Sequence, residues 1–123
     1  MLQGLRTVIY PAPDLDRTKA WYARVLGLSP YFDEPFYVGF HVGGFELGLL
    51  PEPAPAQAPG GVLAYWGDDD VGAAYTRLLA LGARTHEAPK DVGDGITVAT
   101  VIDPFGNILG LIRNPHFNPG AIR

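Results

Sequence analysis

The chain has 123 residues, of which 47% are hydrophobic and 18% charged, and its formal net charge is -4. This length and composition fit one compact domain with its own core, whereas nine scattered lysines and arginines provide no basic patch for nucleic acid. Because the chain lacks cysteine, disulfides, thiolate metal sites and a cysteine nucleophile are excluded.

The first predicted strand runs from Leu5 to Tyr10, before Pro11 and Pro13. The residues ahead of it lack the basic and apolar regions of a signal peptide. Nowhere does the sequence approach eighteen consecutive apolar residues. We therefore expect a soluble, cytoplasmic protein with no membrane partner.

A helix is predicted from the N-cap Asp14 to Gly27, a residue that favours the left-handed end of a helix. Residues that can form one buried face recur at three- and four-residue spacing: Leu15, Thr18, Trp21, Tyr22, Val25 and Leu26. The next predicted strands, 36–42 and 45–50, are separated by Gly43-Gly44, which favours a tight antiparallel hairpin.

The second half of the chain repeats this plan after a Pro/Ala-rich connector. A strand over 62–66 leads to Asp68-Asp69-Asp70, which favours a helix start, and to a helix that ends at Gly82. Its expected buried face is made of Val71, Ala74, Tyr75, Leu78 and Leu79. Strands 97–102 and 108–112 flank a turn formed by residues 103–107.

The repeat predicts a single domain made of two modules. Module one covers about residues 5–50, a linker covers 51–61, module two covers about 62–113, and an irregular tail covers 114–123. Two such half-sheet units bury one face each by packing, and the concave face that remains is a natural place for a ligand.

Three stretches carry a resemblance to a known family: Asp14-Leu15, the helix end from Trp21-Tyr22 to Val25-Leu26-Gly27, and Asp103-Pro104-Phe105-Gly106-Asn107. Over residues 5–114 the chain resembles the vicinal oxygen chelate superfamily, which includes glyoxalase I, bleomycin-resistance proteins and extradiol dioxygenases. The resemblance implies an α+β fold of two βαβββ modules whose curved mixed sheets surround a concave cavity. It does not fix an activity, because one fold hosts many chemistries.

Metalloenzymes of this family take His, Glu or Gln ligands from the first and last strand of each module. The resemblance places these positions at Thr7, Glu46, Leu63 (or Val62 with a one-residue slip) and Gly110. Only Glu46 is a typical ligand, and a single carboxylate is too few for a catalytic ion. We therefore expect no metal and no cofactor, although unaligned groups such as His41, His86 and Glu46 remain an alternative ligand set.

Glu46 and His41 are the candidate catalytic residues. Strand alternation places Glu46 on the same face as Gly48, and His41 on the same face as Tyr37. A buried Glu46 without a partner would have a raised pKa and could act as a general base. The alternatives are a solvent-facing glutamate and a structural histidine.

Aromatic residues complete the expected ligand pocket. Small-molecule sites combine aromatic walls with a few polar groups, which gives the candidate ligand-binding set Tyr10, Tyr37, His41, Glu46, Tyr65 and Trp66. Core packing is the alternative for each of the aromatic residues.

The leading functional hypothesis is a metal-independent protein that binds a small molecule, acts by sequestration as bleomycin-resistance proteins do, and forms a homodimer. The alternative is an enzyme of the family, such as a lyase, isomerase or dioxygenase, with atypical metal ligands or a metal-free Glu/His acid–base site. A third hypothesis is a purely structural or partner-binding dimer that leaves the cavity unused.

Overall fold

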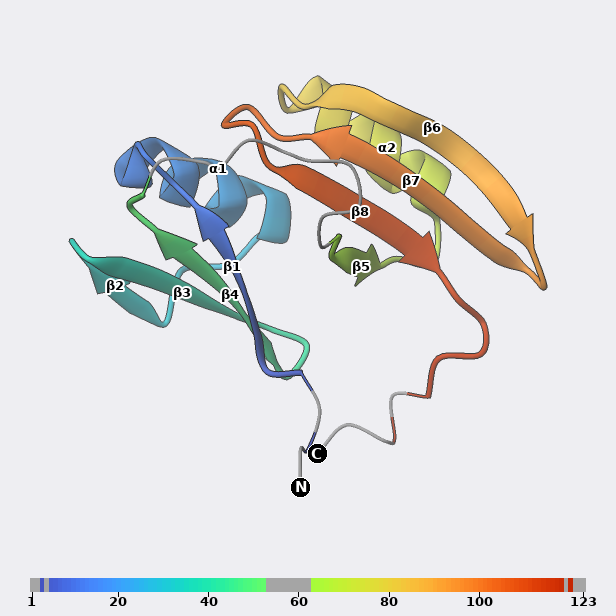
Figure 1. Ribbon diagram of the computed structural model, residues 1–123, viewed down its shortest axis with the longest axis horizontal. Coiled ribbons are helices and arrows are strands. Elements are labelled where there is room, and N and C mark those ends of the chain that lie inside the picture. The colour runs from blue at the N-terminus through green and yellow to red at the C-terminus, as the bar shows by residue number, and fades with distance from the viewer. Residues whose placement is uncertain (1–2, 4, 53–62, 119, 121–123) are drawn as a thin grey trace. The chain divides into compact units, whose positions relative to one another are not determined.

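The computed structural model describes residues 3, 5–52, 63–118 and 120 (Figure 1). The chain divides into two compact units, each considered by itself. Unit 1 contains the elements between Thr7 and Leu50, and unit 2 contains those between Tyr65 and Arg113. Most of the predicted linker, residues 53–61, lies outside the described residues.

Unit 1 consists of β1 (Thr7–Pro11), α1 (Leu15–Leu26), β2 (Phe32–Glu34), β3 (Tyr37–Val42) and β4 (Phe45–Leu50). Its sheet has the order β1-β4-β3-β2, in which β1 is parallel to β4 and the other pairs are antiparallel.

Helix α1 covers one face of this sheet (Figure 1). On that face Val38, Phe40, Leu47 and Leu49 are fully buried, and the ring of Tyr22 packs 5.8 Å from that of Tyr10. The apolar helix stripe and the apolar half of each alternating strand therefore form the core of unit 1.

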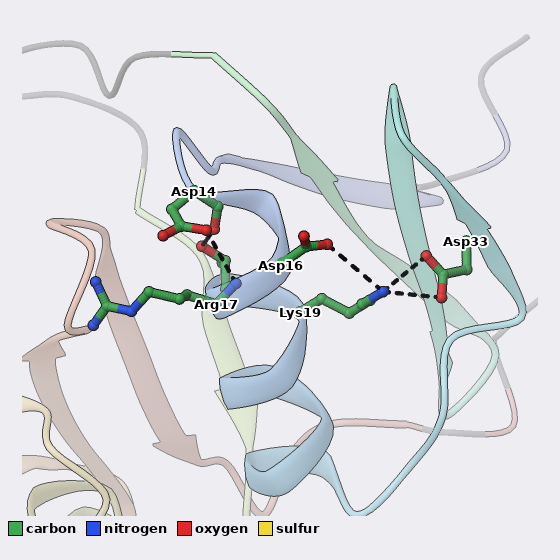
Figure 2. Close-up of polar contacts among 6 residues, drawn as sticks. Asp14, Asp16, Arg17, Lys19 and Asp33 are labelled. Carbon is green, nitrogen blue, oxygen red and sulfur yellow. Dashed lines mark hydrogen bonds and ion pairs between the residues drawn. The ribbon is translucent and has the colours of Figure 1, made fainter.

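The predicted caps of α1 are confirmed. Asp14 accepts a hydrogen bond from the Arg17 amide at 3.3 Å, and Gly27 adopts the left-handed conformation, with φ 66°. Figure 2 shows a further attachment of the helix: Lys19 Nζ lies 3.2 Å from both carboxylate oxygens of Asp33 on β2. The helix is thereby joined to the edge of the sheet.

Unit 2 consists of β5 (Tyr65–Gly67), α2 (Val71–Ala80), β6 (Arg84–Gly93), β7 (Ile96–Ile102) and β8 (Ile108–Arg113). The sheet order β5-β8-β7-β6 repeats that of unit 1, with β5 parallel to β8. α2 begins at the N-cap Asp70 and covers the face that carries the buried side chains of Ala99, Val101, Leu109 and Leu111.

The hairpin between β7 and β8 closes around a buried acid. Asp103 Oδ1 accepts hydrogen bonds from the amides of Phe105 (2.9 Å) and Asn107 (2.8 Å), and its Oδ2 accepts one from Asn107 Nδ2 at 3.0 Å. The Asp-Pro-Phe-Gly-Asn turn predicted from the sequence is confirmed and is held from inside by its first residue.

The predicted α+β class with two βαβββ modules is confirmed. The sequence pattern did not locate β2 and β6, because every residue of both strands is exposed and neither alternates. The first strand starts at Thr7 rather than Leu5 and includes Pro11, which an edge strand tolerates. None of the helices in the described ranges is long and apolar enough to cross a membrane.

Candidate functional site

The register of the unit 1 strands defines a second face, opposite α1. Glu46 on β4 lies between Thr7 of β1 and His41 of β3, while Gly48 lies between Ile9 and Gly39. This face is called the open face below. It confirms that Glu46, Gly48 and His41 share one side of the sheet.

Three hydroxyl groups converge on the Glu46 carboxylate. Its Oε1 accepts hydrogen bonds from Thr7 Oγ1 at 2.7 Å and from the Tyr37 hydroxyl at 2.6 Å, and its Oε2 accepts one from the Tyr31 hydroxyl. These four residues are called the Glu46 cluster. They come from β1, from β3, from β4 and from the segment before β2.

Two glycines make room for the cluster. A Cβ on Gly39 would lie 2.8 Å from Glu46 Oε2 and 3.0 Å from Tyr31 Cε1, and a Cβ on Gly48 would lie 2.7 Å from Tyr37 Cζ. All three distances are below an ordinary van der Waals contact. The absence of side chains at these two positions therefore lets the tyrosine rings lie against the sheet and reach Glu46.

The hydrogen bonds set the charge of the cluster. Burial acts to raise the pKa of Glu46, but hydrogen bonds from Thr7, Tyr31 and Tyr37, together with the nearby His41, lower it below its ordinary value. The expectation of a buried, unpartnered Glu46 with a raised pKa is therefore wrong. Glu46 is an ionised acceptor at neutral pH.

The pKa values of the two tyrosines shift in the opposite direction. The hydrogen bond to Glu46 raises the pKa of Tyr31, and burial followed by the same kind of bond raises the pKa of Tyr37. Both phenols therefore keep their protons, which they donate to the carboxylate.

Aromatic and apolar side chains surround the cluster. The rings of Tyr31 and His41 lie with their centroids 4.1 Å apart, and the ring of Phe32 lies 6.1 Å from that of Tyr37. Tyr31, Phe32 and Ile9 are 55%, 38% and 48% exposed. The open face of unit 1 thus combines the Glu46 carboxylate with an accessible aromatic surface.

The structure brings together only part of the predicted ligand-binding set. Tyr37, His41 and Glu46 meet on the open face, whereas Tyr10 lies on the opposite face, 6% exposed and packed against Tyr22. Tyr10 belongs to the core because its strand position alternates with Ile9.

The remaining two predicted residues lie in unit 2. Trp66 pairs with the buried Leu111, on the side of its sheet that α2 covers. Tyr65 lies on the other side, where a Cβ on Gly110 would be 2.7 Å from Tyr65 Cδ1. On that same side His86 Nδ1 lies 2.8 Å from Thr100 Oγ1.

Tyr31 and Phe32 were missed by sequence reasoning. They lie after the C-cap of α1, in a segment with no apolar periodicity, and Tyr31 is placed by its own amide, which donates to the Gly39 carbonyl at 3.0 Å. Two strand glycines beside three aromatic residues were the available signal.

The residues at the metal-ligand positions implied by the family do not fit a divalent ion. Leu63 and Gly110 have no side-chain donor atom, and the strand registers make Ile108, not Gly110, the counterpart of Glu46, again without a donor atom. The hydroxyl of Thr7 is engaged with Glu46. Within the described ranges, no group of three or more His, Asp or Glu side chains is placed to hold a metal.

The fold matches that of known proteins. The chain belongs to the Glyoxalase/Bleomycin resistance protein/Dioxygenase superfamily, whose family model matches residues 4–111. No curated protein sequence matches it significantly.

Several solved structures share the fold. A lactoylglutathione lyase from Agrobacterium tumefaciens has a TM-score of 0.75 and 24% identity, over 96% of this chain and 100% of that one. A glyoxalase-related enzyme from Fulvimarina pelagi has a TM-score of 0.74 and 22% identity, over 93% and 90%. A bleomycin resistance determinant encoded on transposon Tn5 has a TM-score of 0.66 and 25% identity, over 91% and 98%.

Proposed function

We propose that this protein binds a small organic molecule on the open face of unit 1 without a metal ion, and that it acts by sequestration. The observation that carries the proposal is the set of three hydroxyl donors that Glu46 already accepts. A metal ion at Glu46 would compete with these donors for the carboxylate oxygens and would gain few other ligands.

The accessible rings around the cluster support a binding role. Ligand sites combine aromatic walls with a few fixed polar groups, and the Glu46 cluster supplies such groups between Tyr31, Phe32 and Ile9. The similarity to the Tn5 bleomycin resistance determinant agrees with this role.

The alternative, acid–base catalysis by Glu46 and His41, has weaker support. The lowered pKa of Glu46 makes it a poorer proton acceptor at neutral pH, and its lone pairs already receive three protons in hydrogen bonds. A catalytic base needs a raised pKa instead.

Metal content tests the first part of the proposal. The purified protein and a Glu46→Ala variant are incubated with Ni, Zn, Mn and Fe(II), freed of excess metal and analysed by plasma mass spectrometry. We expect no retained metal in either. Stoichiometric metal in the native protein that is lost in the variant would overturn metal independence and would favour lyase or dioxygenase chemistry.

Ligand screening tests the second part. We expect small aromatic compounds to raise the melting temperature of the native protein, and to shift the NMR signals of the Tyr31 and Tyr37 rings. No effect on these rings from any compound would contradict binding at this face. We also propose a homodimer, which light scattering after size exclusion would test by a mass twice that of the chain.

A further inference from the structure

The hydrogen-bond donors of the Glu46 cluster point inward, toward the carboxylate. We infer that the ligand is a small organic cation, with an ammonium or guanidinium group at the Glu46 cluster and an apolar part against Tyr31, Phe32 and Ile9. This inference rests on the proposed binding function and adds the chemical class of the ligand.

The hydroxyl groups of the Glu46 cluster have no proton left to donate to a ligand. A hydroxyl group has one proton to donate, and Thr7, Tyr31 and Tyr37 each use that proton on Glu46. What the four side chains of the cluster still offer a ligand is therefore only oxygen lone pairs. The complementary ligand group is a hydrogen-bond donor.

The charge of the open face also favours a cation. Neutral hydroxyl donors stabilise the carboxylate without cancelling its charge, so the cluster remains an anion. The strand register also places Glu34 on the open face, opposite Tyr37. The positions that the four described strands contribute to this face include two carboxylates and neither a lysine nor an arginine. An anionic ligand would meet repulsion there, and a cation would meet attraction.

The aromatic rings beside the carboxylate favour an organic cation over an inorganic one. Cations are attracted to the faces of aromatic rings within about 6 Å of the centroid, by roughly 0.5–2 kcal/mol. Tyr31 and Phe32 are accessible next to the carboxylate. An ion with an apolar body gains from both the charge and the rings, whereas a strongly hydrated inorganic cation gains only from the charge.

His41 is the titratable group that faces the carboxylate. It pairs with Glu46 across the strands and packs on the Tyr31 ring. A positive charge on that ring would compete with a cationic ligand, so the binding test is run at about pH 8.

Three probes of similar size and different charge test the inference: phenethylammonium, phenethyl alcohol and hydrocinnamate. Binding is followed by the NMR shifts of the Tyr31 and Tyr37 rings. We expect the ammonium to bind roughly tenfold more tightly than the alcohol, and hydrocinnamate to bind most weakly. Added salt should weaken the ammonium alone.

Two variants test whether the preference for ammonium depends on the charge of Glu46. Glu46→Gln keeps the shape of the side chain and removes its charge, and should reduce the preference for ammonium over alcohol to about one. Glu52→Gln removes the same charge from the exposed bend after β4 and should leave the preference unchanged. If Glu46→Gln unfolds, the salt dependence in the native protein decides in its place.

The outcomes separate the two proposals. Alcohol or hydrocinnamate that shifts the same rings with equal or higher affinity would overturn the cationic ligand and leave small-molecule binding intact. An ammonium preference that survives in Glu46→Gln would also overturn it. If none of the three probes shifts the rings at millimolar concentration, both proposals fail.

Discussion

Units 1 and 2 share a backbone plan and differ in the chemistry of the face that their helix leaves uncovered. In both units a tyrosine ring lies against a glycine of the last strand, Tyr37 on Gly48 and Tyr65 on Gly110. Only unit 1 adds a carboxylate that receives three hydroxyl donors. Both units thus have a last-strand glycine against which a tyrosine packs, while the charged centre is specific to unit 1.

The registers show what replaces Glu46 in unit 2. Ile9 pairs with Gly48 and Tyr65 pairs with Gly110, so the two glycines occupy equivalent positions. The residue two positions earlier is Glu46 in unit 1 and Ile108 in unit 2. Unit 2 has an apolar side chain where unit 1 has its anion.

The largest expected loss of stability comes from replacing Gly48 or Gly110 with alanine. A Cβ on Gly110 would lie 2.7 Å from the Ala64 carbonyl oxygen as well as from the Tyr65 ring, whereas the atoms nearest to a Cβ on Gly48 are the hydroxyl oxygen and ring carbons of the Tyr37 side chain. Because a backbone atom cannot rotate away, Gly110→Ala should cost about 3 kcal/mol of unfolding free energy, and Gly48→Ala about 1–2 kcal/mol. Urea unfolding of each variant measures both.

Gly67→Ala is the matched control for these variants, because no atom lies within 4 Å of its Cβ position. We expect a change near zero there. If Gly48→Ala lowered the unfolding free energy as much as Gly110→Ala, the Tyr37 ring would be as unable to move as a backbone atom. The expected difference between the two glycine positions would then be wrong.

The next largest losses of stability are expected in the hairpin turns, and they should differ between the two units. Asp103→Ala removes the carboxylate that accepts hydrogen bonds from the buried amide of Asn107 and the partly buried amide of Phe105 in the β7–β8 turn, and should cost about 2 kcal/mol. In unit 1 the β3–β4 turn depends on the positive φ of Gly43, so Gly43→Ala should cost about 1 kcal/mol. Equal losses in thermal unfolding would contradict this order.

Acid should destabilise unit 1 through Glu46. The pKa of Glu46 is lowered by folding, so its contribution to stability is complete above the ordinary glutamate value of about 4.3, and is lost as pH falls through the lower folded-state pKa. The free energy of unfolding should therefore fall more steeply with acid in the native protein than in Glu46→Gln.

Tryptophan fluorescence measures this difference in a Trp66→Phe background, where the buried Trp21 of α1 reports on unit 1. Parallel pH profiles for the two proteins would show that folding does not lower the pKa of Glu46, and would contradict the prediction.

The smallest expected effect concerns the ion pairs. Lys19 and Asp33 join α1 to β2 with side chains 29% and 48% exposed, whereas Lys90 and Glu87 lie within β6 with 58% and 55% exposed. A double-mutant cycle with Lys19→Met and Asp33→Asn should give a coupling of about 0.5 kcal/mol. The cycle for Lys90 and Glu87 should give less, and a larger value there would contradict the ranking by exposure.

The sequence predicted both helices and both hairpins because caps, glycine turns and helical periodicity are local signals. Edge strands β2 and β6 have no buried face, so no alternation marks them. For the site, alternation correctly placed Glu46, Gly48 and His41 on one face. It could not reveal Tyr31, whose contact with Glu46 depends on how the segment after α1 folds back over Gly39.

The hydrogen bond between Thr7 and Glu46 joins residues 39 positions apart, across the parallel pair β1 and β4. Parallel pairing over such a separation requires closure of a long loop, whereas the β3–β4 hairpin closes over two residues. We expect β1 to dock late in folding, so that Glu46 receives its third donor only when unit 1 is nearly complete. Pulsed hydrogen exchange during refolding would show this as protection of β3 and β4 before β1, and a partly folded chain would then have no finished binding site.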